Sequence, residues 1–221
     1  MKAECASLTL YHFAEGHHRE VCVWHDRDHK PEVVAHVPGI FISQRWVAPP
    51  EMKALFPPST LEYGGGEYVN MYWTATSADE LGAGFQVLGR RLEAEGRMEP
   101  MRYIHRTWGE RLRPVSAVAR RGLGLSAEAV TCALQTTGLM VTIDPPATAD
   151  SQLVERMLDT GIFTAMVRLT SGSNDVSLWY TDWPDVTAAY RAFRAQAPPP
   201  VAGRLHEGMY CQSMGRYDLY P

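Results

Sequence analysis

The sequence predicts an α+β fold in which one chain holds two similar β-α-β-β-α-β units. The tripeptide Gly-Ile-Phe occurs at residues 39–41 and again at 161–163, each time between a predicted helix and a predicted strand. A second pair of similar segments, at 69–74 and 176–181, follows in the same order. The unequal spacing of the two pairs is explained by one long Pro-rich loop at 47–67, whose counterpart is short. These matches indicate one structural unit used twice, and a repeat of this kind constrains the fold strongly.

The first unit is predicted from residue periodicity and from the residues that begin or end helices. Pro31 lies inside the first helical pattern, where it removes a backbone donor and disfavours helix at Lys30. The helix is therefore expected either to begin near Pro31 or to kink there. Ser77, followed three residues later by Glu80, is a capping box that predicts the start of the second helix. The expected elements are strand 8–13, helix 19–37, strand 40–47, strand 68–76, helix 78–95 and strand 101–108.

The second unit shows the same order of elements, with Pro184 in the first turn of its last helix. The expected elements are strand 139–143, helix 149–158, strand 162–169, strand 176–180, helix 184–196 and strand 204–213. This order is that of the ferredoxin-like unit. We expect a first repeat at 1–113, a linker at 114–136 and a second repeat at 137–221. Each sheet would have helices on one face only, so the bare faces are expected to pack on each other.

Composition excludes several classes of function. The net charge of −4 and the pI near 6.1 give no basic field for a nucleic-acid partner. The charge-poor stretch at 122–143 is interrupted by Glu128 and polar residues, so no membrane association is expected. The 4 cysteines form no Cys-x-x-Cys pair, which indicates reduced thiols in a cytoplasmic protein. The glycines at 64–66 do not lie between a strand and a helix, so they are not a phosphate-binding loop.

The segment around the first helix resembles the EthD-like branch of the dimeric α+β barrel superfamily. The resemblance rests on the run from Trp24 to Val34, on Val37-Pro38-Gly39-Ile40, and on Arg45-Trp46-Val47. It implies that two ferredoxin-like units pack sheet to sheet as a barrel, here within one chain. The second copy departs from the pattern, because residues 152–160 contain no histidine and Thr160-Gly161 replaces Pro-Gly. Any chemistry implied by the resemblance therefore belongs to the first half.

The activities that the resemblance implies are broad. The superfamily includes cofactor-free monooxygenases of polyketide-like rings, lactone isomerases, decarboxylases of aromatic polyketides, haem-using enzymes and proteins without a known reaction. Fold analogy narrows such a choice only weakly. We expect a cofactor-independent enzyme of lyase or isomerase type that acts on a small aromatic or lactone-like metabolite, in a chain that could form a homodimer. The alternatives are a cofactor-free monooxygenase and a non-catalytic binding protein for an apolar metabolite.

Two histidines of the first helix are the leading candidates for chemistry. His25 and His29 are four residues apart, so a helix would place them near one face. The resemblance matches His29 to the histidine before proline, which suits a general acid or base near neutral pH, with His25 in support. The alternative is that His29 only orders the helix start. A metal site with Asp26 or Asp28 is a further alternative, but no third ligand lies at a diagnostic spacing, and we expect no metal.

Other candidates lie on the predicted strands. His105 would share a strand face with Tyr103, either as a second acid or base or as a core histidine. Trp46, Tyr72 and Tyr103 could line a pocket for a flat ring, although most strand aromatics simply pack in a core. Arg45 could hold a carboxylate or enolate oxygen of the substrate, or it could form a structural ion pair.

Overall fold

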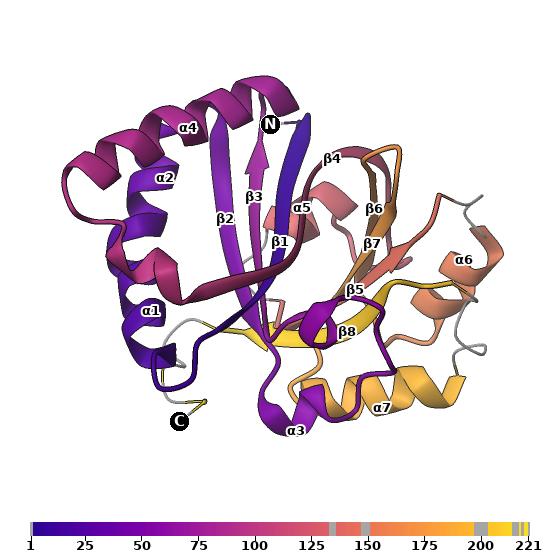
Figure 1. The fold of residues 1–221 in the computed structure, drawn as a ribbon. Helices are drawn as coiled ribbons and strands as arrows, with labels where there is room; N and C mark the ends of the chain where they lie inside the picture. Colours follow the sequence, from indigo (N-terminus) through magenta and orange to yellow (C-terminus); the bar gives the residue numbers. More distant parts are fainter. Residues whose placement is uncertain are drawn as a thin grey trace.

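The computed structural model shows a closed barrel of antiparallel strands with helices packed on its outer surface (Figure 1). It describes residues 2–132, 136–146, 151–196, 203–213, 217 and 219–220. The strands follow one another around the barrel in the order β1-β3-β2-β8-β5-β7-β6-β4, and β4 closes the ring against β1. The predicted α+β fold class is confirmed.

Both halves of the chain follow the β-α-β-β-α-β order. The first half contains β1 (Cys5–Phe13), α1 (His18–Trp24), a π-helical turn (His25–His29), α2 (Lys30–His36), β2 (Ile40–Val47), α3 (Pro50–Lys53), a 3-10 turn (Glu62–Gly65), β3 (Tyr68–Thr74), α4 (Ala78–Ala94), a second 3-10 turn (Glu99–Tyr103) and β4 (Ile104–Ala119). The rest contains α5 (Ala127–Cys132), β5 (Gly138–Asp144), α6 (Ser151–Asp159), β6 (Ala165–Thr170), β7 (Asp175–Thr181), α7 (Val186–Gln196) and β8 (His206–Gln212).

The two sheets have the same internal order, β4-β1-β3-β2 in the first half and β8-β5-β7-β6 in the second. They join at two seams of different length. At one seam β4 pairs with β6 from Arg113 to Ala119, and at the other β2 meets β8 only at Trp46 and Val47. The interior contains one hydrophobic cluster to which all eight strands contribute. The barrel is therefore a shared core that both halves complete.

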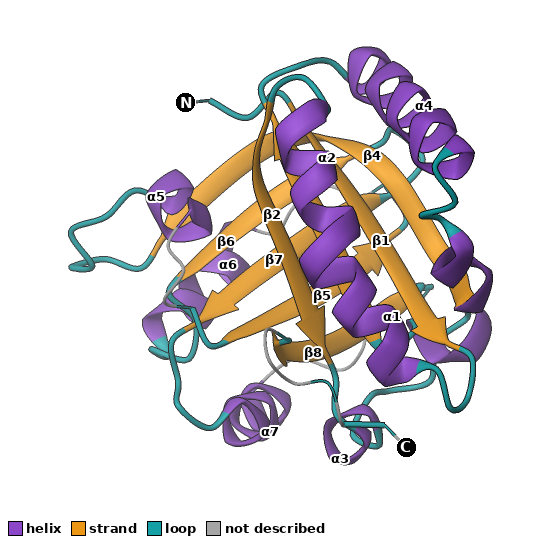
Figure 2. Ribbon diagram, turned by 90° about the vertical axis from the view of Figure 1, so that its left-hand side faces the viewer, coloured by secondary structure: helices purple, strands orange, loops and turns teal. Residues whose placement is uncertain are grey.

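Side chains alternate between this interior and the outer surface of each strand. On β1, Leu8 and Leu10 belong to the interior cluster, whereas Tyr11 and Phe13 pack against helix residues outside it. Figure 2 shows α1 and α2 lying across the outer face of the first sheet, near β2 and β1. In the part of the chain that the structure describes, no helix is long and apolar enough to cross a membrane.

The first helix passes through Pro31 instead of beginning there. The backbone N–H of Lys30 donates to the carbonyl of His25, five residues earlier, which makes residues 25–29 a π-helical turn. This wider turn lies directly before the proline, whose ring would clash with a carbonyl in a regular α-helix. Turns of this kind are rare and occur often at functional sites.

The last strand of the first half differs most from its prediction. It was expected at 101–108, but it begins at Ile104 and continues to Ala119, because its second part pairs with β6. Met101 lies in the preceding 3-10 turn. Strand residues and α5 therefore occupy much of the segment that the sequence predicts as a linker, of which residues 133–135 lie outside the described residues. The start of the helix predicted at 149–158 also lies outside them.

The two copies of Gly-Ile-Phe offer a matched test of the fold. Gly39 and Gly161 both have positive φ, 80° and 76°, a conformation that costs another residue about 1–2 kcal/mol. A β-carbon at Gly39 would lie 2.5 Å from Thr76 Cγ2, whereas at Gly161 the nearest atom, on Arg120, is 3.8 Å away. We expect Gly161→Ala to lower the free energy of unfolding by about 1 kcal/mol. Gly39→Ala should lower it by about 1–3 kcal/mol more than Gly161→Ala does, because of the clash with Thr76. Urea unfolding of both variants measures this difference, and equal losses would contradict it.

Candidate functional site

The outer face of the first sheet is polar where a helix packs on it. The strand register places one side chain from each strand in a row across that face, and in the first half this row consists of Ser43, Tyr72, Ser7 and Arg111. The row at the matching position of the second half consists of Met166, Trp179, Met140 and Met209. The apolar row packs in a hydrophobic cluster with residues of α6 and α7. The two halves share a register, but at this row the first half is mainly polar and the second half is apolar.

A cavity of about 560 Å³ lies over three residues of this row, Tyr72, Ser7 and Arg111. Its polar lining consists of Ser7, Thr9, His29, Tyr72, Gln86, Arg106, Glu110 and Arg111. Its apolar lining comes mainly from the helices and the turn before β4, namely Val33, Phe85, Leu88, Met98 and Met101. Apolar walls with a few converging polar groups are typical of small-molecule sites.

His29 is the titratable group that the π-helical turn brings to this cavity. Its ring stacks on Trp24 with the centroids 4.7 Å apart. Burial lowers the pKa of His29 to about 4, although the charge of Asp28 acts in the opposite direction. Its Nδ1 is buried and has no hydrogen-bond partner among the described residues. His29 is therefore neutral at pH 7 and able to accept a proton.

Tyr72 lies in the wall of the same cavity, on β3. Burial raises its pKa to about 12, while the side chains of Asn70 and Ser43 act in the opposite direction. Its hydroxyl is buried, with the side chains of Asn70 and Ser43 beside it. At neutral pH the phenol keeps its proton, so it can donate a hydrogen bond to an oxygen of a bound molecule.

His25 lies behind His29 and does not line the cavity. The two rings are 5.8 Å apart, and His25 Nδ1 is 3.4 Å from Asp26 Oδ1. Burial lowers the pKa of His25 to about 4, although its hydrogen bond to Asp26 acts in the opposite direction. For Asp26 burial alone would raise the pKa, but His25 and Arg45 outweigh it and the pKa is lowered. The geometry fits a supporting role for His25.

Arg45 is already occupied by protein groups. Its Nη2 donates to Asp26 Oδ2 at 2.6 Å, and its Nη1 donates to Cys22 Sγ at 2.9 Å. Its side chain is only 1% exposed. This geometry matches the structural ion pair, the second of the two interpretations that the sequence allows. Trp46, its neighbour on β2, belongs to the barrel interior, where its ring is 6.4 Å from that of Tyr180.

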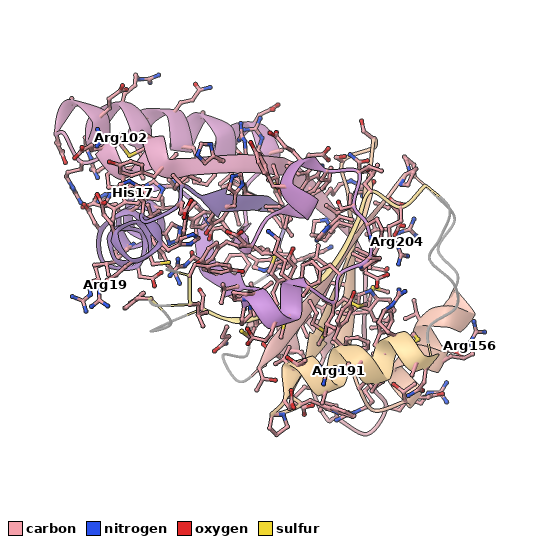
Figure 3. The ribbon with its side chains drawn as sticks, turned by 60° about the horizontal axis from the view of Figure 1, so that its bottom comes forward. His17, Arg19, Arg102, Arg156, Arg191 and Arg204 are labelled. Carbon is pink, nitrogen blue, oxygen red and sulfur yellow. The ribbon has the colours of Figure 1, made fainter. Side chains whose placement is uncertain are left out.

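The structure does not bring His105 or Tyr103 to the cavity. His105 is exposed and stacks on His12, with the centroids 4.9 Å apart, so it is not a core histidine either. Tyr103 belongs to a 3-10 turn, where strand alternation does not apply, and stacks on His17 at 3.5 Å. Figure 3 shows His17 and Arg102 close together at this end of α1.

The sequence alone does not assign six polar residues of the lining to the site: Ser7, Thr9, Gln86, Arg106, Glu110 and Arg111. Ser7 and Thr9 alternate with Leu8 and other interior residues, so their polarity on the helix-facing side of β1 was a usable signal. The arginines had no such signal, because their positions depend on the register of β4 with β1. Across the described ranges, no group of three or more His, Cys, Asp or Glu side chains could hold a metal ion.

The sequence matches no known family model and no curated protein. The fold is similar to three solved structures. An anthrone oxidase-like protein has a TM-score of 0.57 at 14% identity, covering 96% of this chain and 92% of its own. A putative chlorite dismutase has a TM-score of 0.55 at 10% identity, with 96% and 95% covered. A variant chlorite dismutase from Candidatus Nitrospira defluvii has a TM-score of 0.51 at 7% identity, with 96% and 92% covered. At these identities the likeness establishes the fold alone.

The low pKa of His25 predicts a specific acid sensitivity. The folded pKa of about 4 lies below the unfolded value near 6.5, so the unfolded chain binds more protons between these pH values. The stability that depends on neutral His25 is complete above about pH 6.5 and falls as the pH drops toward 4. We expect His25→Asn to lose about 1–2 kcal/mol less between pH 7 and pH 5 than the wild type. Urea unfolding at both pH values measures the loss; exposed His36→Asn is the control, and an identical loss in His25→Asn would contradict the assignment.

Proposed function

We propose that the cavity over the first sheet is the active site of a cofactor-independent enzyme that performs acid/base chemistry on a small aromatic or lactone-like metabolite. One observation carries this proposal. Three residues of the first-half row, Tyr72, Ser7 and Arg111, line one cavity together with His29, whereas the matching row of the second half packs in a hydrophobic cluster. That second row consists of Met166, Trp179, Met140 and Met209. Packing alone does not require a polar layer at this position.

The two titratable groups of the cavity suit complementary roles. Neutral His29 accepts a proton from an acidic carbon or hydroxyl of the substrate, and it returns the proton to the product. The protonated phenol of Tyr72 donates a hydrogen bond to the oxygen on which negative charge develops. Because both groups are largely buried, these electrostatic interactions are stronger than they would be in water. Isomerisation, lyase action and decarboxylation all use such a pair.

A buried polar group without a hydrogen-bond partner favours an enzyme over a binding protein for an apolar metabolite. His29 Nδ1 is buried with no hydrogen-bond partner among the residues that the structure describes. Such a group costs about 1–3 kcal/mol. An apolar ligand would leave that cost in place, whereas a substrate with oxygen atoms would offset it. The resemblance to the EthD-like branch also favours an enzyme.

A second candidate is a cofactor-free monooxygenase acting on a polyketide-like ring. One of the solved structures with this fold is described as anthrone oxidase-like, which favours this alternative. The first step would be the same, because removal of a proton makes an aromatic ring electron-rich before oxygen attacks it. The two candidates therefore differ in whether turnover depends on oxygen.

Replacement of His29 by asparagine tests the proposal. We expect His29→Asn to lower kcat/KM by about 10²–10⁴-fold on whichever member of a panel of aromatic acids and lactones the wild type converts. His36→Asn, an exposed change on the same helix, serves as the matched control and should keep wild-type activity. In the wild type, kcat/KM should fall only as the pH approaches 4, where His29 becomes protonated.

Other outcomes would select another function. Turnover that stops without oxygen would favour the monooxygenase, and binding without turnover would favour the binding protein. Unchanged kcat/KM in His29→Asn would rule out the acid/base role of this residue.

A further inference from the structure

The first-half strand β4 carries a local irregularity that changes where one arginine points. Leu10 pairs with Trp108, but the next residue, Tyr11, pairs with Arg106, so Thr107 is an extra residue in β4. Such a β-bulge commonly redirects a side chain near a functional site. Thr107 Oγ1 donates to the carbonyl of Leu10 at 3.1 Å, which stabilises the bulge.

Without the bulge, Arg106 would follow the alternation of Leu112 and Trp108, both of which pack with the barrel interior. The extra residue instead places Arg106 opposite Tyr11, whose side chain packs outside the barrel. Arg106 thereby becomes part of the cavity lining. In the second half, β8 pairs with β5 in a continuous register, and the bulge has no counterpart there.

Two glycines leave room for Arg106 and for the second arginine of the cavity. A β-carbon at Gly109 would lie 3.1 Å from Arg106 Cδ, and one at Gly82 on α4 would lie 2.5 Å from Arg111 Nη1. At the position of Gly109, the second half has Glu207, opposite Thr142. The wall of the first-half cavity is therefore shaped around two guanidinium side chains.

Neither arginine has a carboxylate partner within the described ranges. Nearby, by contrast, Arg91 and Arg97 are both paired with Glu32. Glu110, which lies between the two cavity arginines in sequence, also belongs to the cavity lining, and its Oε1 accepts a hydrogen bond from Asn174 Nδ2 at 2.7 Å. Two unpaired guanidinium groups in one cavity wall provide a strong site for an oxyanion, and arginine binds a carboxylate in a bidentate manner.

We infer that the molecule bound in this cavity carries a carboxylate, which Arg106 and Arg111 hold while its ring lies against the apolar wall of Phe85, Met98 and Met101. The role of His29 toward this carboxylate rests on the proposed function. Binding of the carboxylate by the two arginines does not. It narrows the substrate class from aromatic or lactone-like metabolites to aromatic or lactone-like carboxylates.

A binding experiment tests this inference separately from catalysis. The probes are 1-naphthoate and its neutral amide, 1-naphthamide, titrated by calorimetry into the wild type and into Arg106→Gln, Arg111→Gln and Arg113→Gln. Arg113 is exposed, as Arg106 and Arg111 are, and lies on the same strand, but it does not line the cavity, so it controls for overall charge. Thermal unfolding of each variant verifies that it is folded.

We expect the wild type to bind the naphthoate at least about 10-fold more tightly than the amide, with an affinity that weakens as salt is added. Arg106→Gln and Arg111→Gln should each weaken naphthoate binding by about 10- to 100-fold and leave amide binding unchanged. Arg113→Gln should behave as the wild type. Equal affinity for the two probes, no binding of either, or an equal loss in Arg113→Gln would overturn the inference.

The same titration on His29→Asn separates this inference from the proposed function. Preference for the carboxylate that persists in His29→Asn, together with unchanged turnover, would leave the anion site in place and remove the acid/base role. If His29→Asn loses turnover but the wild type shows no preference for the carboxylate, the acid/base role would stand and the anion site would be ruled out.

Discussion

The buried ion pair between Asp26 and Arg45 is the interaction on which the candidate site depends. A helix normally packs on a sheet through apolar side chains, but here the sheet presents Ser43, Tyr72 and Ser7 to the helix. The 2.6 Å contact of Asp26 with Arg45 joins the π-helical turn directly to β2 across this polar layer. Breaking such a pair by removing one partner costs about 3–5 kcal/mol, because the other charge stays buried. The same contact fixes the turn that presents His29 to the cavity.

The second half has apolar side chains at the matching positions. At the register positions where the first half has its polar row, the second half packs Met166, Trp179, Met140 and Met209 with helix residues. The shared interior cluster then holds the first sheet in place through both seams of the barrel. Proteins commonly depart from ideal packing at functional sites and compensate elsewhere. Here the polar row and the apolar row lie at matching positions of two similar units.

The repeated segments predicted the fold well because they carry information that does not depend on tertiary contacts. The predicted bounds of β2, 40–47, match the structure, and the capping box of Ser77 and Glu80 is present. The largest error concerned β4, whose second part is a strand only because β6 pairs with it. Residues 114–119 lack a strong pattern of their own, so a partner far along the chain decides their structure.

The site was less predictable, for a related physical reason. The placement of His29 followed from its spacing and from the resemblance, and that of Tyr72 from its strand. The position of Arg106 could not be predicted from the sequence, because the single extra residue Thr107 moves the arginine to the opposite face of the strand. Simple alternation along β4 would place Arg106 inside the barrel with Trp108. A one-residue shift in a strand moves a side chain to the opposite face, and no local sequence signal marks this one.

The arrangement of charge across the cavity also constrains what it can do. His29 and Tyr72, the two groups proposed to move protons, are uncharged at neutral pH, because burial lowers one pKa and raises the other, whereas the lining also includes the carboxyl group of Glu110. The two unpaired arginines are the cationic groups of the same cavity. A negatively charged substrate would therefore be drawn in by the arginines and meet no negative charge on the groups that move protons. Deprotonation of that substrate would raise its negative charge further, and the nearby guanidinium groups would stabilise it. The guanidinium groups would thus both hold the substrate and stabilise the charge that develops when it loses a proton.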